Sequence, residues 1–565
     1  MKALNQQILG DEARWGFRLL IVFCLADLLD VRTPLVNAIV AALGWGNDLS
    51  VAQLAFMVGI LQISIALVLT ATICYVRVIG LRWRLRLQDL HELSPQFADA
   101  IDEQSMEIVG RKTHLLSNSR MIDGNAFCLP SFLGTTLVIG GGLRMQFRRA
   151  PSQALAIIAH ELAHVKNHDS GLMLVSVYLI MSYIAINVAS VVYTQAWFFL
   201  QIPWDRFFAL GFSFLDVLFF EARPIAVNAL PLLPAAAVVL ATLFLIRNRE
   251  MYADEVAALH GYRREIAAVL RTDSAKIRPR SLFHPPATAR SRRIVDPLGW
   301  GRLNMAFLCC IALIACRGAD AFSAALTPLK VDTTPHSGTF ADTLPQVGGN
   351  WAFWLGEAGG MLILVTSALI IAHHVYRAGM SLIALGFGKA ALVTPTALAG
   401  LSCTLGTWLG TVFSARFLSM ATDQNYAQLT RTVLAAELES AFVYGMFSCA
   451  LCLSASTAVL ITVRTPARRA AGGLLWLIAT LLLAFIWMVP VNLLFMALVP
   501  FITGTSLYEV DIGADLPFGT VLLIAAIPLV LVASIGHLAT RRAGDRRMLG
   551  HPARVHASRL VDVPE

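Results

Sequence analysis

The segment Ala154–Asp169, with the sequence ALAIIAHELAHVKNHD, carries three residues whose types and spacing could form a metal site. The pattern predicts one amphipathic helix. His160 and His164 are four positions apart, so both imidazoles lie on one face of that helix and can reach the same ion. Glu161 lies beside the first histidine, where it can contact a water molecule on that ion and act as a general base. The alternative is a pair of solvated histidines on an ordinary helix.

A catalytic zinc site needs three protein ligands and one open position for water. The best candidate for the third ligand lies in Arg247–Leu259, RNREMYADEVAAL, where Glu250 and Asp254 are again four apart on one helical face. Glu250 can bind zinc, and Asp254 can accept a hydrogen bond from the outer nitrogen of a histidine ligand. Glu255 is the next candidate ligand if Glu250 is not one. The alternative is a solvated helix whose charged side chains pair among themselves.

Together these two segments resemble the HtpX-type and CAAX-prenyl-protease-type membrane zinc metallopeptidases. In that family a HExxH helix is followed, after membrane spans, by a Glu-x-x-Ala-Asp helix. Asp123–Leu143, DGNAFCLPSFLGTTLVIGGGL, resembles the family's Asn-Ala-Phe segment and the strand leading into the zinc helix. Leu282–Ile294, LFHPPATARSRRI, is similar to its His-Pro-Pro-Thr…Arg-Ile segment, but Ala287 stands in place of Thr and Ser291 in place of Ile. The resemblance covers about residues 105–295.

The resemblance implies a peptide hydrolase with one zinc ion per chain, held by His160, His164 and Glu250. Glu161 would take the proton of the attacking water and deliver it to the leaving amine. Asp254 would orient His160. The family pattern does not make His168, which follows the zinc helix, a ligand.

Two residues of the His-Pro-Pro segment, His284 and Arg290, are the best cationic candidates for stabilising the oxyanion of the reaction. Structural hydrogen bonding is the alternative for both. Asn125, in the Asn-Ala-Phe segment, is a candidate for contacting the substrate backbone, and a plain turn asparagine is the alternative.

The stretch Thr135–Gly141 is predicted to be an edge strand that pairs with an extended peptide through main-chain hydrogen bonds. Its candidate substrate-binding residues are Thr136, Val138 and Gly140. An ordinary apolar strand that ends in a glycine turn is the alternative.

The composition indicates a polytopic membrane protein. Apolar residues make up 57% of the chain, charged residues 14%, and the mean hydropathy is +0.67, whereas soluble domains are about half apolar and about a quarter charged. Eight of the nine cysteines lie in apolar segments, which favours small buried hydrophobic residues over a disulfide framework. The first apolar run contains Asp27 and Asp30 and lacks a small-residue cleavage site, so no cleavable signal peptide is predicted.

The expected fold is mainly α, with about ten spans and a cytoplasmic α+β zincin-like peptidase domain. Predicted spans lie near residues 17–45, 51–76, 171–193, 225–246, 304–325, 355–375, 390–413, 442–463, 474–498 and 518–538. Three regions follow from them. Residues 1–78 hold two spans, residues 79–303 form the peptidase region from the polar segments 79–170 and 247–303, and residues 304–565 hold about six spans with no assigned function. Within the first polar segment, residues 88–112 have helical patterning and residues 115–143 that of short strands and turns.

The net charge of +8 is unevenly distributed. Arginines gather in every second loop, including six arginines and one lysine from Arg271 to Arg293. The positive-inside rule therefore predicts a protein of the bacterial inner (plasma) membrane with both termini and both zinc segments on the cytoplasmic side. Beside a span, such a basic run favours a cytoplasmic flank over a nucleic-acid partner. The expected partners are the lipid bilayer and protein or peptide substrates, and the sequence does not indicate an oligomeric state.

The function that fits best is a membrane-embedded zinc endopeptidase that cuts membrane-associated or misfolded proteins at the cytoplasmic face. One alternative is a signalling metallopeptidase of the BlaR/MecR type, which also has HExxH beside membrane spans but lacks the Asn-Ala-Phe and His-Pro-Pro segments. Another is a membrane scaffold or sensor with a vestigial site. The intact Glu161 argues against the last.

Overall fold

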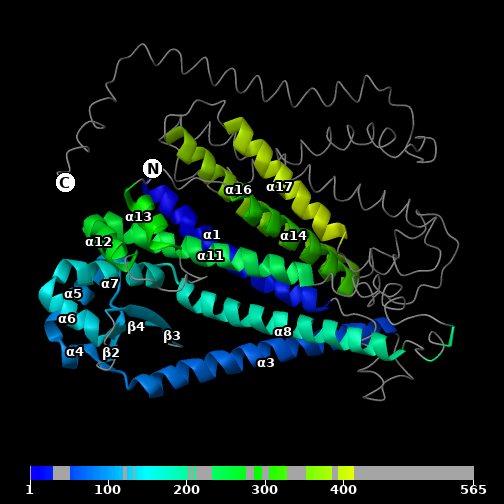
Figure 1. Ribbon diagram of the computed structural model, residues 1–565, viewed down its shortest axis with the longest axis horizontal. Coiled ribbons are helices and arrows are strands. Elements are labelled where there is room, and N and C mark those ends of the chain that lie inside the picture. The colour runs from blue at the N-terminus through cyan, green and yellow to red at the C-terminus, as the bar shows by residue number, and fades with distance from the viewer. Residues whose placement is uncertain are drawn as a thin grey trace, which may run out of the picture. The chain divides into compact units, whose positions relative to one another are not determined.

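The computed structural model describes residues 2–29, 51–118, 124–131, 134–201, 205, 209–210, 232–274, 285–295, 304–326, 351–384 and 392–412. Contacts divide the chain into two compact units, residues 1–456 and 457–565, and every described residue lies in the first. This part consists mostly of helices with one four-stranded sheet (Figure 1). The expectation of a mainly α protein with a small α+β part is therefore confirmed for the described residues.

Most of the long helices are strongly apolar. They are α1 (Lys2–Leu29), α3 (Val51–Leu85), α8 (Asp169–Gln201), α11 (Leu232–Ala257), α14 (Met305–Leu326), α16 (Trp351–Ala384) and α17 (Val393–Val412). Four stretches are long and apolar enough to cross a membrane, namely Phe56–Leu81, Ser170–Ala196, Leu232–Arg271 and Ala358–Gly379. A helix rises about 1.5 Å per residue, so about 20 residues cross the hydrocarbon core.

These four stretches overlap the spans predicted near residues 51–76, 171–193, 225–246 and 355–375, and the third extends beyond the predicted end at 246 as far as Arg271. The segments near 304–325 and 390–413 form α14 and α17, which are not among the four; Met305–Ala319 of α14 is a shorter apolar helix. Of the segment 17–45 only the part in α1 is described. The spans predicted at 442–463, 474–498 and 518–538 lie outside the described residues, so the total of ten stays a prediction.

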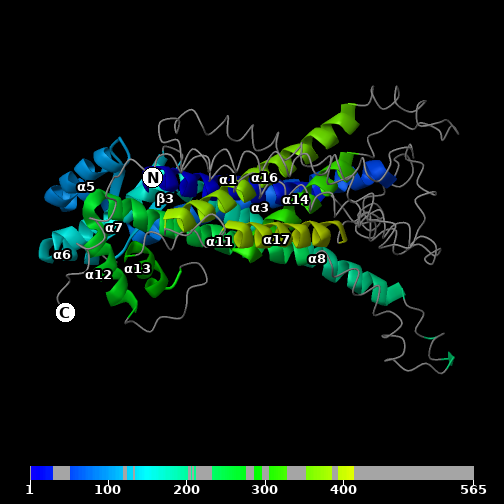
Figure 2. The ribbon, with the colours of Figure 1, turned by 90° about the horizontal axis from the view of Figure 1, so that it is seen from above.

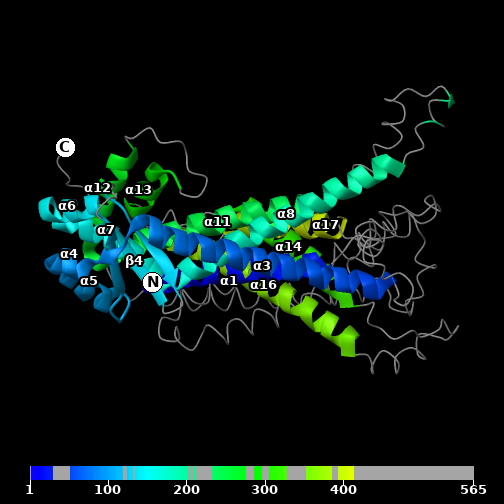
Figure 3. The same ribbon diagram turned by 90° about the horizontal axis from the view of Figure 1, so that it is seen from below.

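The apolar helices pack side by side. α3 runs along α8, and α11 contacts α1, α8 and α14 (Figures 1 and 3). α14 packs most extensively against α17. Gly410 of α17 makes that close approach possible, because a Cβ atom there would lie 2.9 Å from the carbonyl oxygen of Leu313.

The sheet lies at one end of α3 and α8, in the polar part of the chain. Its strands are β1 (Gln88–Asp89), β2 (His114–Asn118), β3 (Ala126–Ser131) and β4 (Gly134–Gly140), in the spatial order β1-β2-β4-β3. β4 is parallel to β2 and antiparallel to β3. The surrounding elements are α4 (Leu90–Leu93), α5 (Pro95–Ile108), α6 (Gly141–Arg149), α7 (Pro151–Lys166), the π-helical turn η1 (Ala258–Tyr262), α12 (Arg263–Ser274) and α13 (Ala287–Val295). α12 and α13 pack on each other beside α7 (Figure 2).

The prediction that Thr135–Gly141 is an edge strand is wrong. β4 is hydrogen-bonded on both sides, with Thr136 opposite His114 of β2 and Leu129 of β3. Its backbone donors and acceptors are already used in the sheet, so it cannot take up a peptide. The strand with β4 as its only partner among the described residues is β3, which begins directly after Asn125.

Helix α7 is the central helix of this polar part. It begins at Pro151, whose fixed φ and missing N–H suit the first position of a helix. Its apolar face joins one buried core with α5, the sheet and the end of α11, through residues such as Ile158 and Leu162. The helix ends at Lys166, and His168 adopts a left-handed φ of 52° before α8 begins. The metal-motif helix therefore leads into an apolar helix after one sharp turn.

A buried polar cluster joins three of the long helices. Asp27 of α1 accepts hydrogen bonds from the hydroxyl of Tyr183 in α8, at 2.7 Å, and from Nε of Arg317 in α14, at 2.9 Å. All three side chains are buried among apolar residues. A charge in such surroundings is very costly unless it is paired, so this cluster fixes the positions of α1, α8 and α14 relative to one another.

Breaking this cluster should destabilise the protein strongly. Removing one member leaves an uncompensated buried charge, and we expect Asp27→Asn or Arg317→Gln to lower the free energy of unfolding by roughly 3–5 kcal/mol. Tyr183→Phe removes only a hydrogen bond and should cost about 1–3 kcal/mol. Reversible unfolding in detergent would measure these changes. The double variant Asp27→Leu with Arg317→Met should recover much of the loss, and equal stability of the wild type and both charge variants would contradict the argument.

Candidate metal centre

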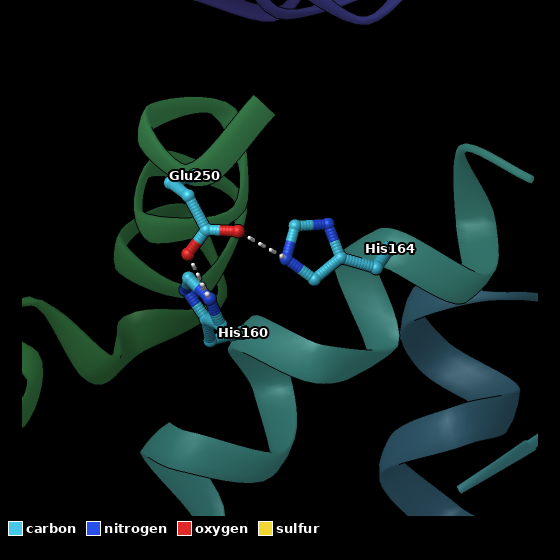
Figure 4. A group of neighbouring side chains, drawn as sticks. All are labelled: His160, His164 and Glu250. Carbon is cyan, nitrogen blue, oxygen red and sulfur yellow. Dashed lines mark ion pairs between the residues drawn. The ribbon is translucent and has the colours of Figure 1, made fainter. Parts of the chain in front are cut away.

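Two helices bring the three predicted ligands together. His160 and His164 project from α7 toward Glu250, which projects from α11 (Figure 4). One ligand atom from each residue lies within 4.8 Å of the others, and all three residues are buried. This is the one such group of histidine, cysteine and acidic residues found in the described part of the chain. His168 and Glu255 are not in it, as the sequence analysis expected for His168.

The distances fit a small divalent ion held by two nitrogens and one carboxylate. Nε2 of His160 is 3.6 Å from Oε2 of Glu250, and Nε2 of His164 is 3.6 Å from Oε1. Ligands about 2.0–2.1 Å from a tetrahedral zinc ion lie about 3.4 Å from one another. The three ligand atoms lie within 4.8 Å of one another, so they are close enough to gather around such an ion, and three protein ligands would leave the fourth position of a tetrahedral ion to water.

The outer nitrogen of His160 is fixed by a carboxylate. Nδ1 lies 2.9 Å from Oδ1 of Asp254, one turn after Glu250 on α11, which leaves Nε2 to face the ligand cluster. Burial lowers the pKa of His160, but the carboxylates of Asp254 and Glu250 outweigh burial and raise that pKa to about 9 in the absence of a metal ion. A metal that takes this histidine as a ligand competes with a proton for it, so metal binding weakens as the pH falls.

Arg290 contacts Asp254 rather than the ligand cluster. Its Nε and Nη2 donate to Oδ2 and Oδ1 of Asp254, at 2.7 and 2.6 Å, in a bidentate pair. Burial lowers the pKa of Arg290, but Asp254 raises it further than burial lowers it, so the guanidinium stays charged. The contacts favour a positioning role for Arg290, and its predicted role at the oxyanion stays a prediction.

Arg249 is a member of the site that the sequence analysis passed over. Its side chain is buried, and Nη1 lies 3.3 Å from Oε1 of Glu250 and 3.0 Å from Sδ of Met173 in α8. The alternative considered for this helix was a pairing of its charged side chains in solvent; Arg249 and Glu250 do pair, but inside the protein. The signal in the sequence was an arginine directly before the candidate ligand.

Strand β3 packs against the turn of α7 that carries Glu161. Glu161 is partly exposed, unlike the ligands around it. Its main-chain carbonyl accepts a hydrogen bond from Sγ of Cys128 in β3, at 3.3 Å. This contact places the edge strand beside the helical turn that carries the predicted base. Asn125 is exposed, and its carbonyl oxygen accepts from the N–H of Gly140 at 3.0 Å.

The three substrate-binding residues predicted in β4 have their backbone groups engaged in the sheet. Thr136 and Val138 are buried in β4 and Gly140 ends that strand, so none of them has the free backbone that the peptide-pairing prediction required. His284 lies outside the described residues, so its predicted role stays a prediction.

In a comparison with models of known protein families, residues 86–297 match peptidase family M48. Residues 86–297 belong to this family. The match spans the polar segment before α7, the metal cluster and helix α13. Searches of curated proteins and of solved structures gave no significant match.

Family M48 comprises peptidases that depend on zinc, and the resemblance to HtpX-type and CAAX-prenyl-protease-type enzymes is thereby confirmed. The cluster of His160, His164 and Glu250 lies inside the M48 region and has the donor atoms that zinc prefers. The M48 region also contains the Asp254–Arg290 pair. In this chain that pair joins the second metal-binding helix to α13.

Arg290→Gln should weaken zinc binding, because Asp254 would lose the partner that holds it against His160. Residues that orient a metal ligand typically contribute about 10–100-fold in affinity, and we expect a loss in that range. Competition with a zinc chelator measures it. A variant with wild-type zinc affinity and a reduced turnover would instead assign Arg290 to the oxyanion.

Proposed function

We propose that the protein is a membrane-embedded zinc endopeptidase. The observation that carries the proposal is the convergence of His160, His164 and Glu250 on one point, with Glu161 on the same helix and inside the M48 region. One zinc ion per chain would be held by these three ligands. The M48 match also supports this function over a signalling peptidase of the BlaR/MecR type.

Zinc in such a site supplies a Lewis acid that polarises the scissile carbonyl and acidifies the attacking water. The protein residues then have separate tasks. Glu161 accepts the proton of the attacking water on its carboxylate and passes it to the amine that leaves. Asp254 keeps the proton of His160 on Nδ1, so that Nε2 carries the lone pair toward the ion, and Arg290 holds Asp254 in that position.

We propose β3 as the strand that binds the substrate. Among the described residues it pairs with β4 alone, and Cys128 lies against the turn of α7 that carries Glu161. A peptide added to this edge would run next to the base and would be recognised mainly through its backbone. The exposed Asn125 at the start of β3 is available to such a peptide, so its predicted contact is retained.

We further propose that the substrates are membrane-associated or misfolded proteins, cut at the cytoplasmic face of a bacterial inner membrane. Support comes from the two apolar helices that adjoin the site. α8 follows α7 after one turn, and α11 itself continues into the ligand Glu250. The site would therefore lie near the membrane surface. The arginine-rich segments beside it favour the cytoplasmic side.

Glu161→Gln should keep the fold and the zinc ion but lose peptide hydrolysis by at least about 10²–10⁴-fold, because the ligands stay while the base is removed. Turnover of an unfolded protein substrate and zinc content per chain are measured on the same purified sample. Glu92→Gln, an exposed carboxylate on α4, is the matched control and should behave as wild type. Hydrolysis at the wild-type rate by Glu161→Gln would exclude this mechanism, and a wild-type protein with zinc but no hydrolysis would favour the vestigial scaffold or sensor.

The side of the membrane is tested by labelling single cysteines in a background without the native ones. Ser337→Cys, in the predicted outer loop 326–352, should react with a membrane-impermeant thiol reagent in intact cells. Ser274→Cys, at the end of α12, should react only after the cells are opened. The opposite labelling pattern would place the site, and therefore its substrates, outside the cytoplasm.

A further inference from the structure

Arg249 lies at the seam between α11 and α8, next to the third metal ligand. Neighbouring residues on a helix point about 100° apart, so Arg249 does not share the face of Glu250 and Asp254. Its side chain nevertheless bends back, and Nη1 reaches Oε1 of Glu250 at 3.3 Å. Oε1 is the same oxygen that faces Nε2 of His164 (Figure 4). The guanidinium therefore acts on the oxygen nearest the second histidine.

The same nitrogen also contacts α8. Nη1 of Arg249 is 3.0 Å from Sδ of Met173, which lies five residues after His168 at the turn between α7 and α8. One guanidinium thus connects the helix that supplies the third ligand with the helix that continues from the first two. Together, these two contacts hold Glu250 at a fixed distance from the histidines.

Burial distinguishes this arginine from an ordinary surface or lipid-facing one. Arg249 is 8% exposed and Glu250 4%. A guanidinium that serves the lipid headgroups extends its charged end to the interface, whereas that of Arg249 turns inward to a buried carboxylate. Placing a cation beside a metal site is unfavourable by charge alone, because it repels the metal. The presence of an arginine here is therefore explained by the geometry of its contacts and not by its charge.

We propose that Arg249 is a positioning residue that fixes the carboxylate of Glu250 in the orientation that completes the metal site. It does so by occupying Oε1 from the side of α8, so that the carboxylate cannot rotate away from the two histidines. This inference rests on the proposed zinc site. It adds a determinant of metal affinity that is separate from the Asp254–Arg290 pair, which orients His160.

The test compares metal affinity in Arg249→Met, Arg249→Lys and wild type, all full-length and in detergent. Positioning predicts a loss of about 10–100-fold in zinc affinity for Arg249→Met, with a smaller loss for Arg249→Lys. A role of charge alone predicts the opposite sign, because removing the repelling cation would tighten binding. Arg264→Met removes an exposed arginine on α12 and serves as the matched control, with affinity unchanged.

Substitution with Co²⁺ gives a readout that simple destabilisation does not change. The visible absorption of bound Co²⁺ follows the ligand geometry, so the spectrum of folded Arg249→Met should differ from that of wild type. Met173→Leu keeps the volume but removes the sulfur contact, and should shift affinity in the same direction by a smaller factor. Wild-type affinity and an unchanged Co²⁺ spectrum in both Arg249 variants would overturn the proposal. A wild-type protein that binds no zinc would instead overturn the proposed function.

Discussion

The site depends on one buried carboxylate. Asp254, in α11, accepts a hydrogen bond from the Nδ1–H group of His160 in α7 and two hydrogen bonds from Arg290 in α13. Three elements far apart in the chain therefore meet on its two oxygens. A buried carboxylate is tolerated only when it is paired in this way, so the requirement to satisfy Asp254 holds α7, α11 and α13 together. The four-residue spacing from Glu250 to Asp254 then places the third ligand one turn away, beside the histidines.

Continuity of the helices explains how the site is held. α11 runs unbroken from its apolar part into Glu250 and Asp254, and α7 leads into α8 after the left-handed His168. The ligands are thus at the ends of long, laterally packed helices, where small rotations of either helix would separate them. Arg249 and Met173 bridge α11 and α8 close to this point. The polar core around α7 and the packed apolar helices restrain the same two helices from opposite ends.

Local spacing predicted the parts of the site that depend on one helix at a time. The pairs His160–His164 and Glu250–Asp254 follow from the helical period, and the family resemblance indicated that the two helices meet. What the sequence could not give was the partner of each side chain in three dimensions. An arginine in the His-Pro-Pro segment can reach either substrate or Asp254, and nothing in its neighbours decides between them. The position of β4 in the sheet was predicted wrongly for a similar reason. An apolar strand that ends in glycines has the same sequence pattern at the edge of a sheet and in its interior. Only the pairing of β4 with both β2 and β3 shows that it is an interior strand.

Helices outside the M48 region, residues 86–297, make contacts with helices inside it. Arg317 of α14 lies 290 residues from Asp27 in the chain, yet the two form a buried ion pair that Tyr183 of α8 completes. Because α8 continues from the metal-motif helix, this pair connects a helix outside residues 86–297 to the element that carries two of the ligands. An isolated M48 region would leave Tyr183 without its carboxylate and expose the faces of α8 and α11 that α1 and α14 cover. The described helices on both sides of the M48 region therefore pack against the elements that hold its site.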